Sequence, residues 1–199
     1  MKATLRSADS DVAGDFTGEV LYGDAWRGHE FRGKRVAVLA TGREAARVVP
    51  GVAMTAASVK VFLEDADWVI PSMPRPLAGL ARVGSAIPVV GHCARRSVAR
   101  LHLRLAVKDP WTRRLLTPDD RFGAHATTAS SGYYPTLQGE HCKLIRWPVY
   151  ALTEQGVRTA EGIEHRVDCL VVPAPGRLRR FSPGTLQTPD TTEHEERTA

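Results

Sequence analysis

Residues 40–45, which read Ala-Thr-Gly-Arg-Glu-Ala, constrain the fold of this 199-residue chain more than any other segment. They follow the apolar run 36–39 and lead into residues 43–49, whose pattern predicts the start of a helix. A buried strand, a tight glycine-containing turn and a helix N-terminus with small residues are the parts of a βαβ unit that binds a dinucleotide. The sequence therefore predicts an α/β fold with a Rossmann-like NAD(P)-binding unit at about residues 30–80.

The three glycine positions of such a turn have different tasks. Gly42 keeps the position at which the backbone approaches a pyrophosphate at a helix N-terminus. Ala45 is acceptable at the third position, because only a small residue is needed for helix–strand packing. Ala40 occupies the first, where a Cβ costs about 1 kcal/mol or more if the backbone needs a positive φ. We expect a cofactor-binding turn, weakened by its first residue, made of Ala40, Thr41, Gly42, Arg43, Glu44 and Ala45.

An acidic residue follows the second predicted strand, at residues 59–63. Glu64 lies 22 residues after Gly42, about where a carboxylate accepts hydrogen bonds from the adenosine ribose and repels a 2′-phosphate. This position favours weak NAD(H) binding and makes NADP(H) less favourable. The alternative is that Glu64, Asp65 and Asp67 form a solvated turn after the strand, and the sequence does not decide between the two.

The rest of the chain predicts a helical connection and additional C-terminal strands. Residues 94–108 have the periodicity of an amphipathic helix, and Asp109-Pro110 is typical of a helix start. The first helix is expected to end or kink near Val49, because Pro50 follows. Four short strands are predicted, at residues 142–146, 149–152, 156–159 and 167–172. These strands either pack onto the Rossmann-like unit or require a partner.

The predicted α/β domain covers residues 16–181. Residues 16–32 are expected to be an irregular lead-in to the first strand. The polar residues 1–15 are expected to be mobile, and the polar, acidic tail at residues 182–199 to be disordered.

Composition argues against several classes of function. The net charge is +5, but the basic residues are spread along the chain and the cluster 177–180 has no interleaved aromatic residues, so nucleic-acid binding is not expected. No apolar run approaches the roughly 20 residues of a membrane helix, and the N-terminus has no signal-peptide core, which predicts a cytoplasmic protein. The three cysteines and seven histidines have no zinc-type spacing, so no metal site is expected.

Several motifs resemble the Baeyer–Villiger and related flavin-containing monooxygenases. Phe16, Gly18, Tyr22 and Trp26, followed by residues 31–38, are similar to the family pattern F-x-G-x-x-x-H-x-x-x-W that leads into the NADPH-binding strand. Further similar motifs follow in the family's order, at residues 61–62, 68–71, 116–119, 122–124, 132–137 and 168–176. The resemblance covers about residues 16–181 and implies an NAD(P)-binding, flavin-dependent oxidoreductase.

The chain also departs from the family pattern at functional positions. Tyr22 replaces the fingerprint histidine, and Glu64 replaces the basic residue that contacts the NADPH 2′-phosphate. His125 and Ala126 stand where the family has Lys-Arg, and Pro175 replaces the threonine of its A-T-G motif. No FAD-binding glycine motif precedes Phe16. The resemblance therefore carries over no catalytic residue, and implies FAD only if a partner chain supplies or completes its site.

Three functions remain open at this point. The first is a dinucleotide-binding component of a flavin monooxygenase, without autonomous activity, that works with an FAD-domain partner protein or as a homo-oligomer. The second is a catalytically inactive pseudoenzyme that acts as a binding or regulatory partner. The third is a nonfunctional fragment of a decayed gene.

Overall fold

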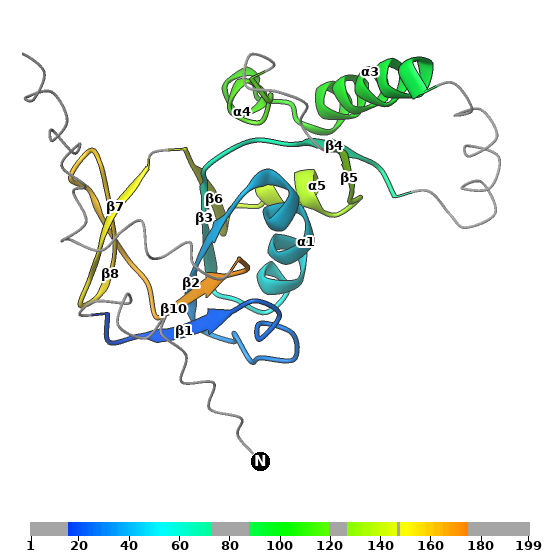
Figure 1. The fold of residues 1–199 in the computed structure, drawn as a ribbon. Helices are drawn as coiled ribbons and strands as arrows, with labels where there is room; N and C mark the ends of the chain where they lie inside the picture. Colours follow the sequence, from blue (N-terminus) through cyan, green and yellow to red (C-terminus); the bar gives the residue numbers. More distant parts are fainter. Residues whose placement is uncertain (1–15, 73–87, 120–126, 147, 175–199) are drawn as a thin grey trace, which may run out of the picture.

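The computed structural model describes residues 16–72, 88–119, 127–146 and 148–174. Its central sheet has five parallel strands in the order β1-β10-β2-β3-β6 (Figure 1). They are β1 (Glu19–Tyr22), β2 (Arg35–Ala40), β3 (Ser58–Leu63), β6 (Cys142–Ile145) and β10 (Cys169–Val172). The predicted α/β fold is confirmed, and two of the C-terminal strands pack into the same sheet as the first βαβ unit. The tail and the N-terminal segment predicted to be disordered or mobile lie outside the described residues.

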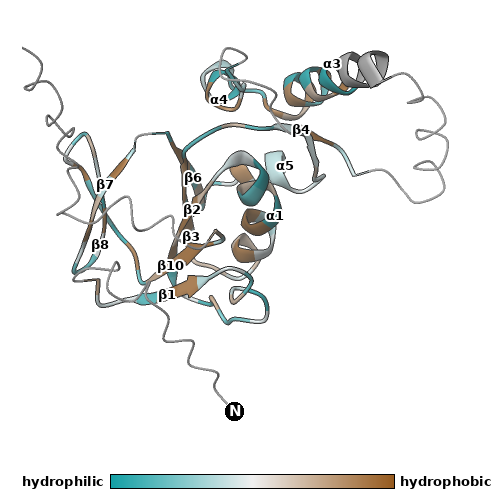
Figure 2. Ribbon diagram, in the orientation of Figure 1, coloured by the Kyte–Doolittle hydropathy of each residue, from teal (hydrophilic) through white to brown (hydrophobic). Residues whose placement is uncertain are grey.

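Different layers cover the two faces of this sheet. Val36 and Val38 pack in one apolar cluster with helix α1 (Gly42–Ala53), whereas Ala37 and Leu39, which alternate with them, pack in a second cluster. The second cluster includes residues of an antiparallel sheet made of β7 (Val149–Thr153), β8 (Gly156–Thr159) and β9 (Glu164–Arg166). Figure 2 shows the hydrophobic residues gathered on the central strands and on α1. Burial on both faces explains why β2 reads as a continuous apolar run.

A second group of elements lies beside α1 (Figure 1). Strands β4 (Trp68–Ile70) and β5 (Thr127–Ala129) pair in parallel, with helices α3 (Pro88–Ala106), α4 (Pro110–Leu115) and α5 (Tyr133–Leu137) around them. Helix α4 begins as its sequence predicts, because the Asp109 carboxylate accepts a 2.6 Å hydrogen bond from the Thr112 N–H. Among the described helices, none combines the length and apolarity needed to cross a membrane.

The expectation of an irregular lead-in over residues 16–32 is wrong in part, because β1 forms within it. Its residues pair in parallel with β10, from Glu19 opposite Cys169 to Tyr22 opposite Val172. The strand has only four residues and none of them is fully buried. Its stability therefore comes from the ladder with β10, which no local pattern reveals.

Helix α1 continues through Pro50 to Ala53, so of the two expected outcomes, an end or a kink near Val49, the end does not occur. Proline lacks the N–H that would bond to the carbonyl four residues earlier, which here belongs to Ala46. The Ser130 hydroxyl donates a 2.9 Å hydrogen bond to that carbonyl. The acceptor that Pro50 leaves is thus satisfied by a residue that follows β5.

An ion pair links the start of β2 to the start of β10 and predicts a pH effect. The Arg35 side chain donates to both carboxylate oxygens of Asp168, at 3.0 and 2.6 Å, and the Arg35 N–H donates to the same group. These hydrogen bonds lower the pKa of Asp168 to about 2. The lowered pKa contributes stability that is present above about pH 4 and is lost as the pH falls towards 2.

We expect the Asp168→Asn variant to unfold more easily than the unmodified chain at pH 6, and the difference to shrink as the pH falls from about 4 to 2. Because the Asp168 side chain is 40% exposed, the difference should not exceed about 1 kcal/mol. Urea unfolding over this pH range measures it, with Glu161→Gln at an exposed site as the control. A difference that is constant with pH would contradict the expectation.

Candidate dinucleotide site

The turn at residues 40–45 lies where the order of the strands reverses. Along the chain, β2 is followed by β3 and β6 on one side, and the chain then returns to β10 on the other side. Ligands of open α/β sheets bind at such a switch point, outside the carboxyl ends of the strands. Ala40 ends β2, Thr41 is the N-cap residue and Gly42 begins α1. The predicted turn therefore has the position of a dinucleotide-binding turn.

Glu64 reaches the same end of the sheet, because β3 runs parallel to β2. Ala40 is paired with Leu63 in the strand register, and the Glu64 N–H donates a 3.2 Å hydrogen bond to the Ala40 carbonyl. The Glu64 side chain is exposed. The structure thus brings all seven predicted site residues together: Ala40, Thr41, Gly42, Arg43, Glu44, Ala45 and Glu64.

The expected backbone strain at Ala40 is absent. Ala40 is 1% exposed and continues the β2 ladder, and no described residue other than glycine has a positive φ. The strand extends through Ala40 and the chain turns only at Thr41, so the Cβ meets no conformational penalty. The prediction that this residue weakens the turn through its φ angle is wrong.

The backbone N–H groups at the start of α1 already have acceptors within the chain. The Gly42 N–H donates to the Asp65 carbonyl at 2.7 Å, and the Arg43 N–H donates to the Asp67 carboxylate at 2.8 Å. Thr41 and Glu44 form a capping box, in which the Thr41 N–H donates to the Glu44 carboxylate at 2.8 Å. The groups that hold a pyrophosphate in such folds are therefore engaged by the chain's own oxygens.

Gly42 is needed for the loop that follows β3. A Cβ on Gly42 would contact the Asp67 backbone nitrogen, and would lie 2.9 Å from the Asp67 Cβ and 3.0 Å from the Ala66 carbonyl carbon. The glycine at this position thus allows residues 65–67 to pack closely against the start of α1. Sequence reasoning assigned this task to a pyrophosphate.

Acidic groups surround the positive end of α1. Asp67 and Glu44 accept hydrogen bonds from backbone N–H groups there, and the exposed Glu64 follows at the end of β3. Such carboxylates stabilise a helix N-terminus but repel a phosphate brought to the same place. These residues have the position of a dinucleotide-binding site, but their negative charge does not suit a diphosphate. Glu64 and Asp65 are exposed, as in a solvated turn, but Asp67 caps the helix.

A cluster that sequence reasoning missed lies at the opposite end of the sheet. One ligand atom each of Glu19, His29 and Cys169 lie within 4.8 Å of one another, which is a spacing that a metal ion could use. The Lys34 ammonium lies 2.9 Å from the Glu19 carboxylate and 3.1 Å from the His29 Nε2. Burial raises the pKa of the Cys169 thiol to about 12, so the thiol is protonated at neutral pH. The positive charge next to the Glu19 carboxylate is therefore supplied by the Lys34 ammonium of the chain itself.

Other residues of the predicted motifs have packing roles or lie outside the described residues. The Trp26 ring packs so closely on α1 that a Cβ at Gly51 would lie 2.7 Å from it. Tyr133 and Tyr134 are each 1% exposed, and burial raises the pKa of both phenols. All three side chains therefore have packing roles. His125, Ala126 and Pro175 lie outside the described residues.

Comparison with known proteins supports the expected resemblance. The chain is 27% identical over 183 residues to a Baeyer–Villiger monooxygenase of Pseudomonas aeruginosa, in a match that covers 79% of this chain and 35% of that protein. It is 30% identical over 184 residues to an uncharacterized monooxygenase of Mycobacterium tuberculosis strain H37Rv, covering 79% of this chain and 37% of that protein. No protein-family model matches the chain.

Solved structures show the same fold. A steroid monooxygenase bound to NADP has a TM-score of 0.64 and 22% identity, and the match covers 79% of this chain and 42% of that one. Cyclohexanone monooxygenase from Rhodococcus sp. Phi1, bound to NADP⁺, also has a TM-score of 0.64, with 19% identity and 41% of its chain covered.

Strand order and the position of α1 define a Rossmann-like α/β fold. Over 79% of its length the chain is similar to proteins named as a Baeyer–Villiger monooxygenase and an uncharacterized monooxygenase. It spans just over a third of the length of these curated relatives.

Proposed function

We propose that this chain is the NAD(P)-binding component of a flavin-dependent monooxygenase and has no monooxygenase activity by itself. The observation that carries the proposal is the position of the 40–45 turn, at the switch point of a Rossmann-like sheet. Relatives named as Baeyer–Villiger monooxygenases, and structural neighbours bound to NADP, support the same role. Ala126, where the family has an arginine, supplies no positive charge to a reacting oxygen.

In this proposal FAD is held with the help of a partner chain. Among the described residues of the five-stranded sheet, only β2 leads directly into a helix through a glycine-containing turn, and the acidic groups around that turn do not favour a second diphosphate. Strands β1 and β6 are the edges of the described sheet, and such edges offer unpaired backbone groups to an FAD-domain protein or to a second copy.

Dinucleotide binding is proposed to be weak and to favour NAD(H) over NADP(H). A diphosphate has to displace the Asp67 carboxylate from the Arg43 N–H, and the exposed Glu64 repels a 2′-phosphate. Only the charge of these residues supports the preference for NAD(H). The structural neighbours do not support it, because they are described as bound to NADP.

A thermal-shift titration tests these statements together. We expect NAD⁺ to raise the melting temperature slightly, NADP⁺ to raise it less, and FAD to leave it unchanged. A ligand at 100 times its Kd would add about 2.7 kcal/mol of stability. The Glu64→Gln variant is the matched control, and should respond more nearly equally to NAD⁺ and NADP⁺. Equal shifts in the unmodified chain would contradict the role of Glu64, and NADPH oxidation by the pure chain would contradict the lack of activity.

A second candidate function is a pseudoenzyme that serves as a binding or regulatory partner. The Asp67 carboxylate on the Arg43 N–H favours it, because a helix N-terminus that is capped from within needs no anionic ligand. The same titration separates the two candidates. A pseudoenzyme of this kind shows no shift with millimolar NAD⁺ or NADP⁺.

A further inference from the structure

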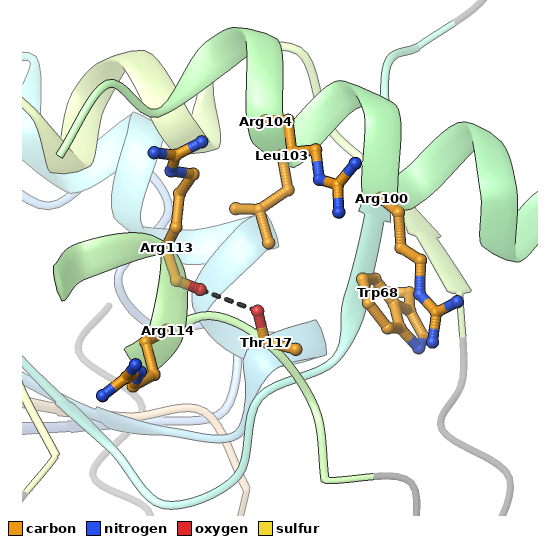
Figure 3. Close-up of a pocket in the computed structure, with 7 residues that line it drawn as sticks. All are labelled: Trp68, Arg100, Leu103, Arg104, Arg113, Arg114 and Thr117. Carbon is orange, nitrogen blue, oxygen red and sulfur yellow. Dashed lines mark hydrogen bonds between the residues drawn. The ribbon is translucent and has the colours of Figure 1, made fainter. Parts of the chain in front are cut away.

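A basic pocket of about 240 Å³ lies between α3, α4 and β4 (Figure 3). Four of its seven lining residues are arginines, Arg100, Arg104, Arg113 and Arg114, and none of the seven is acidic. None of the seven belongs to the 40–45 turn or is Glu64. The pocket is therefore a feature of the chain that the candidate dinucleotide site does not include.

The four arginines line one pocket because α4 follows α3 through a short connection. Arg100 and Arg104 are four residues apart on α3, a spacing that places both on one side of a helix. Arg113 and Arg114 belong to the last turn of α4. The Thr117 hydroxyl donates a 2.8 Å hydrogen bond to the Arg113 carbonyl, which ties the chain after α4 to that helix (Figure 3).

The floor of the pocket is apolar. Trp68 and Leu103 line it and are each only 4% exposed. The Arg100 guanidinium carbon lies 5.5 Å from the centre of the Trp68 ring, within the range of a cation–π contact. Figure 3 shows the guanidinium groups of Arg100 and Arg104 on the side of α3 that faces Trp68. The pocket thus combines small apolar contacts at its floor with a cationic rim.

Arg113 supplies a second indication of a ligand. Its Nε is buried, and it has no hydrogen-bond partner among the described residues. Leaving a buried N–H donor without an acceptor costs free energy, even in a side chain that is only partly buried like that of Arg113. An anion with several acceptor oxygens would satisfy the donor and offset the charge.

We propose that this pocket binds a small organic phosphate. The planar guanidinium groups suit the oxygens of a phosphoryl dianion, and an aromatic or alkyl part of the ligand would lie against Trp68 and Leu103. This binding is independent of the proposed dinucleotide role, because the two sets of residues do not overlap. It gives the chain a second ligand class.

Isothermal titration calorimetry on the purified full chain tests the proposal with three probes. Phenyl phosphate carries both the charge and the apolar ring, inorganic phosphate only the charge, and phenol only the ring. We expect phenyl phosphate to bind about tenfold more tightly than inorganic phosphate, and phenol not to bind. Absence of phenyl phosphate binding at millimolar concentration, or binding of phenol alone, would overturn the proposal.

Two variants assign the binding to this pocket. Arg104→Gln and Arg113→Gln should each weaken phenyl phosphate binding about tenfold. Arg95→Gln is the matched control, because it removes the same charge from an exposed position of α3 that does not line the pocket. Equal weakening in all three variants would mean diffuse attraction and would overturn the proposal. If a variant fails to fold, a salt series on the unmodified chain decides, since binding insensitive to NaCl is also incompatible with an arginine site.

Discussion

Replacing Asp67 by alanine is expected to tighten NAD⁺ binding about tenfold and to lower the stability of the ligand-free chain by about 1 kcal/mol. The Asp67 carboxylate accepts a 2.8 Å hydrogen bond from the Arg43 N–H, where a diphosphate would otherwise bind. Removing it frees this donor and takes away a negative charge next to the ligand. The same change removes a helix cap, so stability and affinity should move in opposite directions.

Calorimetric titration with NAD⁺ and urea unfolding measure the two effects. Asp65→Ala is the matched control, because Asp65 contributes its backbone carbonyl and not its carboxylate to the Gly42 hydrogen bond. Asp67→Asn keeps an acceptor without the charge and should lie between the alanine variant and the unmodified chain. If both alanine variants bind NAD⁺ equally, the effect is one of net charge. If neither binds more tightly, NAD⁺ does not use the N-terminus of α1.

Much of the fold could be predicted from local patterns. Strands β2 and β3 are apolar or β-branched runs, and the start of α4 follows from Asp109 and Pro110. What could not be predicted depends on distant contacts. Helix α1 passes Pro50 because Ser130, 84 residues from Ala46, satisfies the freed carbonyl. Strand β1 exists because β10 pairs with it.

The candidate site was predictable in its position and not in its chemistry. Residues that follow parallel strands meet at one end of a sheet, so the convergence of Glu64 with the 40–45 turn follows from strand order. The capping of α1 by Asp67 depends on how the loop after β3 folds back, and the only local sign of it is an acidic residue in that loop. The basic pocket likewise requires α4 to lie beside α3, which no spacing along the chain reveals.

Gly42→Ala is expected to lower the stability of the ligand-free chain by about 1–3 kcal/mol. The new Cβ would contact the Asp67 backbone nitrogen and would lie 3.0 Å from the Ala66 carbonyl carbon, and neither is the end of a flexible side chain. Residues 65–67 would have to move away from α1, and the Arg43 N–H would lose its acceptor. If Gly42 were needed only to let a pyrophosphate approach, the Gly42→Ala variant would have unchanged stability and weaker NAD⁺ binding.

Urea unfolding without ligand separates these two roles of Gly42. Gly132→Ala is the control, since a Cβ there would have Pro50 Cβ as its nearest neighbour, at 3.3 Å, and the backbone already has a negative φ of −87°. This variant should lose much less stability than Gly42→Ala. A Gly42→Ala variant as stable as the unmodified chain would mean that the loop after β3 does not rest on α1. The self-capped helix N-terminus, and with it the expected weakness of dinucleotide binding, would then have to be abandoned.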